Sequence, residues 1–330
     1  MEDKKISMVD IAALAGVSIA TVSRILNKNG RYSAATERKV LDIIEEYGYQ
    51  INLSARTLRT NRSQSIGVIV PDITNEFFAK IIRSIENYLV PLDYTVFVCD
   101  SNEDEKTESR HITNLVAKDV DGIIYISGKS DVKKIYEQYQ IPVVYIDRRP
   151  RNAGTLVISD NEKGGYLATK ELLDSGCKRI VVLRDYRKLS PIRHRLAGYG
   201  RALNERKIPF DNSLIIDVTV DYSDARKKVN ARIKGGMVFD GVFACTDMIG
   251  VGALHALLEN NISVPGEVKV VGFDDISVSQ ICNPPMTTIR QDTDLFGKYS
   301  VEALLGLIEN NRAKAQKFVV DVSLQKRSTT

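Results

Sequence analysis

The rhythm of apolar segments changes once along this chain, near residue 63, and this change limits the available folds most strongly. From Ser65 onward, short apolar runs such as IGVIV, DGIIYI, PVVYI and VKVVGF alternate with amphipathic stretches such as EFFAKIIRSIENYL. Apolar strands that alternate with helices are typical of parallel sheets covered on both faces. Roughly 265 residues of this pattern are too many for a single sheet. The pattern therefore predicts an α/β core of two similar lobes, each a doubly wound parallel sheet.

Acidic residues end several of the predicted strands. Ligands of open parallel sheets bind outside the carboxyl ends of the strands, so side chains at these ends point into one crevice. A solvated strand end explains any single acid equally well, but six of them together favour a ligand-binding crevice. The six are Asp72, Asp100, Asp147, Asp185, Asp247 and Asp274.

The first fifty residues have a helical period and predict three short helices. Ser7, with Asp10 three residues later, begins the first helix, and the turn at Gly16 leads to Ser18, which begins the second. A third helix ends at Gly48. Two helices joined by a short glycine-containing turn indicate a helix-turn-helix DNA-binding head, although any small three-helix bundle fits the pattern. The residues expected on the inward faces are Ile11, Ala12, Ala15, Val22, Ile25, Leu26, Val40, Ile43, Ile44 and Tyr47.

Positive charge is concentrated near the N-terminus. The first 62 residues carry ten Lys and Arg against seven Asp and Glu, whereas the remaining residues carry 36 against 35. Arg56, Arg59 and Arg62 lie in a stretch without any acid. This surplus is weak on its own, but a dimer would double it beside a DNA-reading helix, where it favours nucleic-acid binding.

Other classes of protein are disfavoured by what the sequence lacks. No apolar run reaches the ~18 residues of a membrane span, and MEDKKISMVD has no apolar signal core, so we expect a cytoplasmic protein without membrane contact. The four cysteines and three histidines have no metal-ligand spacing, which predicts no metal and no cofactor. The motifs argue against an enzyme, because SGKS lacks the earlier glycine of a phosphate loop, GVGALH is no dinucleotide fingerprint, and no nucleophile elbow occurs.

Long blocks of the sequence resemble one family of bacterial transcription factors. The head segment DIAALAGVSIATVSRILN, the linker NLSARTLRTNRSQSIGVIV and the core segments CTDMIGVGAL, VVGFDD and PPMTTIRQD follow the order and spacing of the lactose-repressor (LacI/GalR) family. The core is also similar to periplasmic sugar-binding proteins, which lack the head and are exported. The resemblance implies a helix-turn-helix head over 1–50, a hinge helix and linker over 51–62, and an effector-binding core over 63–330. It implies a first lobe of about 63–160 plus 290–320, and a second lobe of about 161–289 plus the C-terminal strand.

The resemblance also implies which residues of the head contact DNA. Ile19, Ala20 and Arg24 lie at the front of the recognition helix, where Arg24 pairs with guanine O6 and N7 or, alternatively, anchors a phosphate. Ile19 and Ala20 are apolar and suit a thymine methyl group. The remaining implied contacts, mostly to phosphates, are Ser18, Thr21, Ser23, Asn27 and Arg31.

The hinge helix is implied to order over the minor groove of the operator. Asn52 caps this helix, Ala55 allows close approach of two copies, and Leu58 wedges between base steps and kinks the duplex. An ordinary surface linker, with Leu58 packed on the core, is the alternative interpretation.

In the core, the resemblance is greatest to members that bind ribose or related pentoses. Carboxylates that accept hydroxyl pairs, arginines that donate in a fixed fork, and aromatic rings that cover C–H faces suit a sugar. Thr246 departs from the pattern, since ribose binders usually have Asn there. A packing role is the alternative for each residue, and above all for Phe273. The implied effector-binding residues are Asn75, Phe77, Phe78, Asp147, Arg148, Ser159, Asp160, Arg195, Thr246, Phe273, Asp274 and Gln291.

The function implied is repression of a sugar-utilisation operon, with release from double-stranded operator DNA by a neutral, pentose-sized sugar such as ribose or xylose. We expect a homodimer, because one head offers too little interface for specific affinity. The chain ends at LQKRSTT, without the leucine-heptad tail of tetrameric relatives. A corepressor-dependent member of the same family, responding to a metabolite or a phosphoprotein, is the main alternative.

Overall fold

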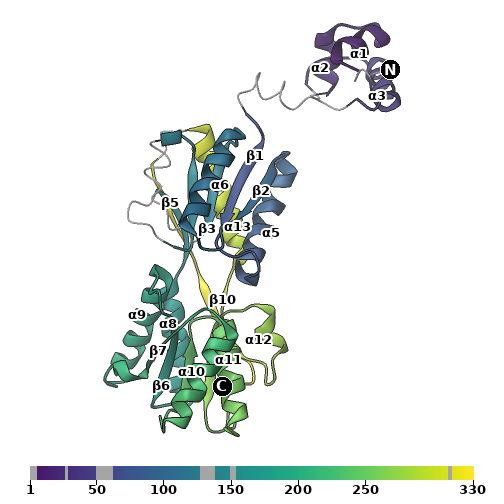
Figure 1. Ribbon diagram of the computed structural model, residues 1–330. Helices are drawn as coiled ribbons and strands as arrows, with labels where there is room; N and C mark the ends of the chain where they lie inside the picture. The colour runs from purple at the N-terminus through teal and green to yellow at the C-terminus, as the bar shows by residue number, and fades with distance from the viewer. Residues whose placement is uncertain (1–5, 27–28, 50–61, 127–137, 149–153, 311–313) are drawn as a thin grey trace. The chain divides into compact units, whose positions relative to one another are not determined.

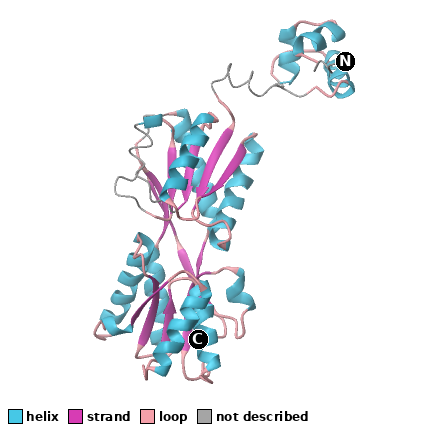
Figure 2. Cartoon of the chain, viewed as in Figure 1, coloured by secondary structure: helices cyan, strands magenta, loops and turns pink. Residues whose placement is uncertain are grey.

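The computed structural model of the protein describes residues 6–26, 29–49, 62–126, 138–148, 154–310 and 314–330 (Figure 1). The chain divides into two compact units, the head, Met1–Ser63, and the core, Gln64–Thr330. The head is helical, and the core has two lobes in which helices flank the strands (Figure 2). The predicted fold class is therefore confirmed.

Three helices make up the described part of the head: α1 (Met8–Ala15), α2 (Ile19–Leu26) and α3 (Ala34–Glu46). A capping box starts α1, because the Ser7 amide donates to Asp10 Oδ2 at 2.9 Å and the Asp10 amide donates to Ser7 Oγ at 3.3 Å. Gly16 ends α1 with φ +69°, a left-handed conformation that favours glycine. These local signals fix the 8-residue helices and the turn between them.

The apolar faces of the three helices meet in a small core. Ile11, Val22, Ile25 and Val40 are almost fully buried there, which accounts for the helical spacing of the apolar residues. One predicted core position was wrong. Tyr47 is 50% exposed, because α3 ends before it and the chain leaves the helix at that residue.

The core contains two six-stranded sheets, with strand orders β11-β5-β4-β3-β1-β2 and β12-β10-β9-β8-β6-β7. Every described strand pair is parallel except β10 with β12, which is antiparallel. The strands of the first sheet are β1 (Ser65–Val70), β2 (Thr95–Asp100), β3 (Gly122–Ile126), β4 (Val143–Ile146), β5 (Thr155–Ser159) and β11 (Lys317–Val320). Those of the second are β6 (Ile180–Asp185), β7 (Ile215–Val218), β8 (Gly241–Ala244), β9 (Lys269–Asp274), β10 (Thr287–Gln291) and β12 (Val322–Gln325).

Helices cover the sheets of each lobe. The first lobe has α5 (Glu76–Leu89), α6 (Glu105–Ala117) and α13 (Thr293–Glu309), with the 3₁₀ turn η1 (Val90–Leu92). The second lobe has α8 (Asn161–Asp174), α9 (Ser190–Glu205), α10 (Tyr222–Lys234), α11 (Asp247–Glu259) and α12 (Ser277–Ile281), with η2 (Asn212–Leu214). Each lobe has its own apolar interior, such as that around Ile81, Phe296 and Leu304 in the first. Among the described residues, no single helix is long and apolar enough to cross a membrane.

The chain passes between the lobes three times, after β5, after β10 and after β11. The second passage lies slightly later than expected. Arg290 and Gln291, which the sequence interpretation gave to the first lobe, belong to β10 of the second sheet. Because the passages connect strand ends that face each other, the lobes can change their separation by small adjustments at three short segments.

Close packing of α8 on α9 shapes the second lobe near these passages. A Cβ atom on Gly198 would lie 2.0 Å from the Glu162 carbonyl oxygen, and one on Gly165 would lie 2.0 Å from the Arg195 carbonyl oxygen. Only glycine allows such an approach at both positions. The helices are therefore close enough for Arg195 of α9 to reach Asn161 at the start of α8, with Nε donating to Oδ1 at 2.8 Å.

Candidate functional site

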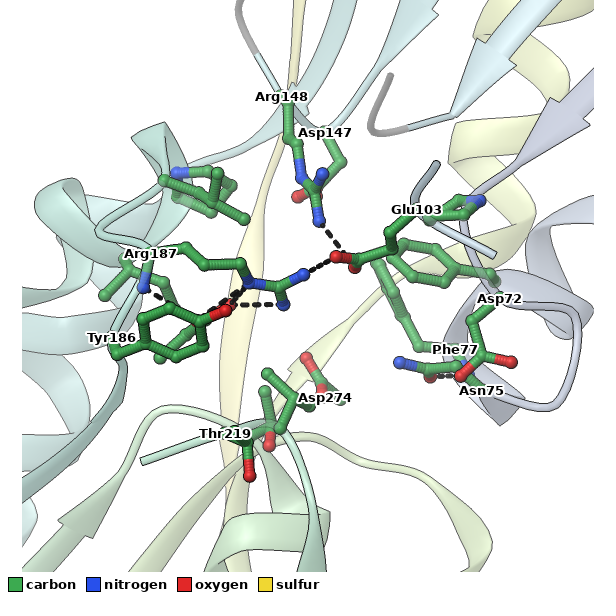
Figure 3. Close-up of a pocket in the computed structure, with 18 of the residues that line it drawn as sticks. Asp72, Asn75, Phe77, Glu103, Asp147, Arg148, Tyr186, Arg187, Thr219 and Asp274 are labelled. Atoms are coloured by element: carbon green, nitrogen blue, oxygen red, sulfur yellow. Dashed lines mark hydrogen bonds and ion pairs between the residues drawn. The ribbon is translucent and has the colours of Figure 1, made fainter. Parts of the chain in front are cut away.

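A cavity of about 370 Å³ lies in the cleft where strand ends of the two sheets face each other (Figure 3). Its size suits a small molecule and its lining mixes aromatic rings with charged groups. Eight of the twelve predicted pocket residues line it: Asn75, Phe77, Phe78, Asp147, Arg148, Arg195, Thr246 and Asp274. The structure thus brings together residues that are up to 199 positions apart, from Asn75 to Asp274.

The first-lobe wall begins with the N-terminus of α5. Asn75 caps this helix by accepting the Phe77 amide at 3.0 Å, which fixes the direction in which the next side chains point. The rings of Phe77 and Phe78 have centroids 5.5 Å apart, and Phe77 meets Phe296 edge-on at 5.9 Å. This packing fixes the orientation of the two rings. They give this side of the cavity an apolar surface that can cover the C–H face of a sugar.

Asp147 and Arg148 complete this wall at the end of β4. Arg148 is buried, and its Nη2 donates to Glu103 Oε1 at 3.2 Å. Its Nε and Nη1 atoms have no hydrogen-bond partner in the described parts of the chain. Burial lowers the pKa of Arg148, against the raising effect of Asp147, Asp185 and Glu108. A buried donor without an acceptor costs about 1–3 kcal/mol, so a ligand that supplies acceptors here removes that penalty.

The second-lobe wall is organised around Arg195. Its Nε donates to Asn161, its Nη1 donates to the Cys245 carbonyl at 2.5 Å, and Nη1 lies 3.8 Å from Asp274 Oδ1. The guanidinium also stacks 3.5 Å above the ring centroid of Phe273. Protein groups therefore hold Nε, Nη1 and one face of this guanidinium.

Four predicted pocket residues are not among the side chains that line the cavity. Phe273 is fully buried in the second-lobe interior beneath Arg195, so its ring supports the arginine from behind. Gln291 Nε2 donates to Asp274 at 2.6 Å, and Ser159 Oγ donates to Gln291 Oε1 at 2.5 Å. Asp160 caps α8 by accepting the Lys163 amide at 2.9 Å. Ser159, Asp160 and Gln291 lie at the lobe passages, whereas Phe273 lies inside the second lobe.

Asp274 shares its surroundings with a second buried carboxyl, Asp247. Burial raises the pKa of Asp274 to about 7, although Arg195 and Gln291 oppose this effect. Burial and the charge of Asp274 raise the pKa of Asp247 well above its ordinary value. Asp247 accepts Thr288 Oγ1 at 2.5 Å and the Ile276 amide at 2.9 Å. Near neutral pH the floor of the cavity therefore carries less negative charge than its count of acids implies.

The strand-end acids divide into two groups. Asp72, Asp147, Asp185 and Asp274 line the cavity, as the crevice interpretation predicts. Asp100 and Asp247 do not line it. Asp100 accepts the amide of Asn102 in its own loop and that of Ile73 in the loop after β1, and Asp247 begins α11 inside the lobe.

The sequence interpretation missed several cavity residues on loops. Glu103 follows β2 and Arg187 follows β6, and the two form an ion pair across the cleft. Neither ends a strand, so the strand-end rule did not select them; a scan of the loops after every strand end would have found them. The other missed lining residues are Pro71, Asn102, Tyr186, Leu189, Pro191, Ile192, Thr219 and Val220.

In the head, α2 presents the residues that the sequence analysis assigned to DNA. Ser18, Ala20 and Arg24 are exposed, and Ile19 is 47% exposed. Thr21 and Ser23 are half-buried, and Arg31 is exposed after the helix. The Arg24 stem lies close to Gly30, where a Cβ atom would be 3.1 Å from Arg24 Cδ. Asn27, Asn52, Ala55 and Leu58 lie outside the described residues.

Comparison with known proteins assigns both units. The family model "Bacterial regulatory proteins, lacI family" matches residues 7–52. The model "Periplasmic binding proteins and sugar binding domain of LacI family" matches residues 63–328. The chain belongs to the lacI family of bacterial regulatory proteins. It is a DNA-binding regulator with a sugar-binding domain, and not an enzyme; the head also separates it from the periplasmic binding proteins.

Curated relatives match this regulator over almost its whole length. It is 33% identical to the HTH-type transcriptional regulator RegA of Clostridium saccharobutylicum, over 98% of this chain and 99% of the relative. It is 33% identical to the ribose operon repressor of Halalkalibacterium halodurans, over 97% and 96%. It is 32% identical to the HTH-type transcriptional repressor PurR of Haemophilus influenzae, over 94% and 93%.

Solved structures resemble the regulator in the same way. The lac repressor dimer bound to operator and the anti-inducer ONPF has a TM-score of 0.89 and 27% identity, with 99% of each chain covered. A LacI family regulator from Enterococcus faecium with bound ribose has a TM-score of 0.73 and 26% identity, over 81% of this chain and 98% of that one. The likeness extends to both units in the first case and to the core in the second.

Proposed function

We propose that this regulator is a homodimeric repressor of a sugar-utilisation operon, which leaves its operator when a neutral, pentose-sized sugar binds between the lobes. As a DNA-binding protein it would act in the cytoplasm. The lac repressor structure, a dimer on operator DNA, supports the dimeric arrangement by analogy. A dimer with two heads fits a two-fold pseudo-palindromic operator.

The single observation that carries the sugar proposal is the pair Asp147 and Arg148 on the cavity wall. Two buried nitrogen atoms of Arg148 have no acceptor among the described residues, and Asp147 beside it has acceptor oxygens. A pair of neighbouring hydroxyls on a sugar can donate hydrogen bonds to Asp147 and accept them from Arg148 at the same time. The Phe77 and Phe78 rings supply the apolar surface that a sugar ring needs.

The size and charge of the cavity favour a single neutral ring. A cavity of about 370 Å³ holds one monosaccharide with a few waters. Five carboxyls, Asp72, Glu103, Asp147, Asp185 and Asp274, line it with three arginines, Arg148, Arg187 and Arg195. Even with Asp274 counted as neutral, four carboxyls face three arginines, so an anionic ligand would meet a small excess of acids. The ribose-bound relative from Enterococcus faecium and the ribose operon repressor of Halalkalibacterium halodurans support a pentose by analogy.

Calorimetry on the purified full chain tests this proposal. We expect heat of binding from ribose, xylose or a related pentose, and none from a disaccharide. Tight binding of a nucleobase, with no heat from any pentose, would overturn the sugar proposal and leave the regulator assignment intact. A ligand that tightens operator binding would indicate a corepressor in place of an inducer.

The DNA-binding proposal has its own test. An operator is first selected from random double-stranded DNA with the wild-type protein. Arg24→Ala should weaken binding by about 1–3 kcal/mol and relax specificity at one base pair. Equal weakening on all sequences would make Arg24 a phosphate anchor. Leu58→Ala, outside the described residues, should reduce operator bending and leave sugar binding unchanged.

A further inference from the structure

Four charged side chains form a continuous chain of ion pairs across the cavity. Arg148 Nη2 lies 3.2 Å from Glu103 Oε1, and Glu103 Oε2 pairs with Arg187 Nη1. Arg187 in turn donates from Nε to both oxygens of Asp185, at 2.9 and 2.8 Å. The Arg148 and Glu103 side chains come from the first lobe and those of Arg187 and Asp185 from the second. This series of ion pairs therefore joins the two lobes, and Figure 3 labels Arg148, Glu103 and Arg187 along it.

Glu103 is the centre of this chain, because its two carboxylate oxygens engage two arginines. The Arg148 side chain is 9% exposed and that of Arg187 is 21% exposed, so water screens these charges less than at the surface. With Asp147, three carboxylates oppose two guanidinium groups on this side of the cavity. Removal of the Glu103 charge would leave two carboxylates, Asp147 and Asp185, against the two guanidinium groups.

We propose that Glu103 is a specificity-determining residue, which excludes phosphorylated sugars by occupying Arg148 and Arg187. The inference rests on the proposed sugar-binding function and extends it to Glu103, a loop residue that does not end a strand. A phosphate binds best to arginines whose forks are unengaged, since it accepts from two parallel N–H groups. Glu103 takes one fork position on each arginine and adds a negative charge between them. A neutral hydroxyl pair brings no further negative charge next to Glu103 and is not excluded in this way.

Glu103→Gln tests this proposal, because it keeps the shape of the side chain and removes its charge. The measured quantity is the ratio of the dissociation constants of ribose 5-phosphate and ribose, obtained by calorimetry on the full chain. We expect this ratio to fall at least tenfold in Glu103→Gln, about 1.4 kcal/mol in favour of the phosphate. The ratio is informative because loss of the cross-lobe ion pair should weaken both ligands alike.

Asp217→Asn is the matched control. Asp217 pairs with Arg184 at 2.7 Å within the second lobe, does not line the cavity, and undergoes the same change of charge. We expect this variant to keep the wild-type ratio. A fall of the same size in the control would show a general charge effect and overturn the proposal, as would an unchanged ratio in Glu103→Gln.

Inorganic phosphate provides a second probe that does not depend on the pentose assignment. We expect inorganic phosphate, added in increasing concentration, to raise the thermal unfolding midpoint of Glu103→Gln above its value in phosphate-free buffer, because a ligand that binds only the folded state stabilises it. Wild type and Asp217→Asn should show no such rise. If wild type binds neither ribose nor its phosphate, the sugar proposal fails, and the phosphate shift alone decides the role of Glu103. No shift in Glu103→Gln would then overturn it.

Discussion

The two walls of the cavity hold their arginines in different ways. Arg195 of the second lobe contacts Asn161, the Cys245 carbonyl and the Phe273 ring, with Asp274 nearby. Arg148 of the first lobe is equally buried, yet two of its nitrogen atoms have no acceptor in the described residues. The second-lobe wall is therefore organised before a ligand arrives, whereas the first-lobe wall needs a ligand to complete its hydrogen bonds.

This difference suggests how binding and closure are coupled. A ligand that is already seated on the Arg195 wall gains the Arg148 hydrogen bonds only when the first lobe is close to it. Its affinity is then greater for the closed arrangement, which is the condition for a ligand to shift a conformational equilibrium. The ion pair between Glu103 and Arg187 acts in the same direction, since it also joins the lobes.

Arg195→Ala should have the largest effect, because it breaks the organised wall. It leaves Asp274 buried without its nearby cation and Asn161 without its partner, which typically costs about 3–5 kcal/mol. We expect a lower thermal midpoint and loss of ribose binding of at least 100-fold, about 2.7 kcal/mol, by calorimetry. Operator binding in a gel-shift assay should persist and no longer respond to sugar. Arg193→Ala, on the exposed face of α9, is the control, and an equal loss there would contradict the account.

Arg148→Ala sharpens the contrast between the walls. Removal of this side chain removes two buried donors that have no acceptor among the described residues, but it also takes a cation from Glu103 and Asp147, so the thermal midpoint should fall less than in Arg195→Ala. The affinity for ribose should nevertheless fall by about 10- to 100-fold, since each tenfold loss corresponds to about 1.4 kcal/mol. Paired melting and calorimetry measurements check both parts. A drop in the midpoint as large as that of Arg195→Ala would show that the two walls are equally complete without ligand.

The smallest expected effect is a dependence of stability on pH that originates in the second-lobe wall. The pKa of Asp274 is raised to about 7 in the folded protein, above its value of about 4 in an unfolded chain. Its contribution to stability is therefore greatest at low pH, falls as the pH rises toward 7, and is level above that. Between pH 5 and pH 8 the thermal midpoint should fall more in wild type than in Asp274→Asn. Identical falls in the two proteins would show that Asp274 ionises normally.

The sequence predicted the lining of the incomplete first-lobe wall better than that of the organised second-lobe wall. Asp147 and Asp274 were identified because they end apolar strands whose carboxyl ends share an edge. Arg148 was identified only through the resemblance to the lactose-repressor family. Phe273 and Gln291 were assigned to the pocket, but the pattern of a strand does not tell whether a side chain reaches the cavity surface or stops behind it. Glu103 and Arg187 were missed because their pairing depends on the approach of two lobes. Tyr47 was placed in the head core because helical periodicity continued past the point where α3 ends.

The effect of sugar on operator binding, and of operator on sugar binding, tests whether this cavity controls DNA binding. The affinity of the full chain for its selected operator is measured with and without saturating ribose, and the affinity for ribose is measured with and without operator. We expect each ligand to weaken the binding of the other by the same factor, typically about 5- to 150-fold for coupled sites. Ribose binding that leaves operator affinity unchanged would contradict the proposal that this cavity controls DNA binding.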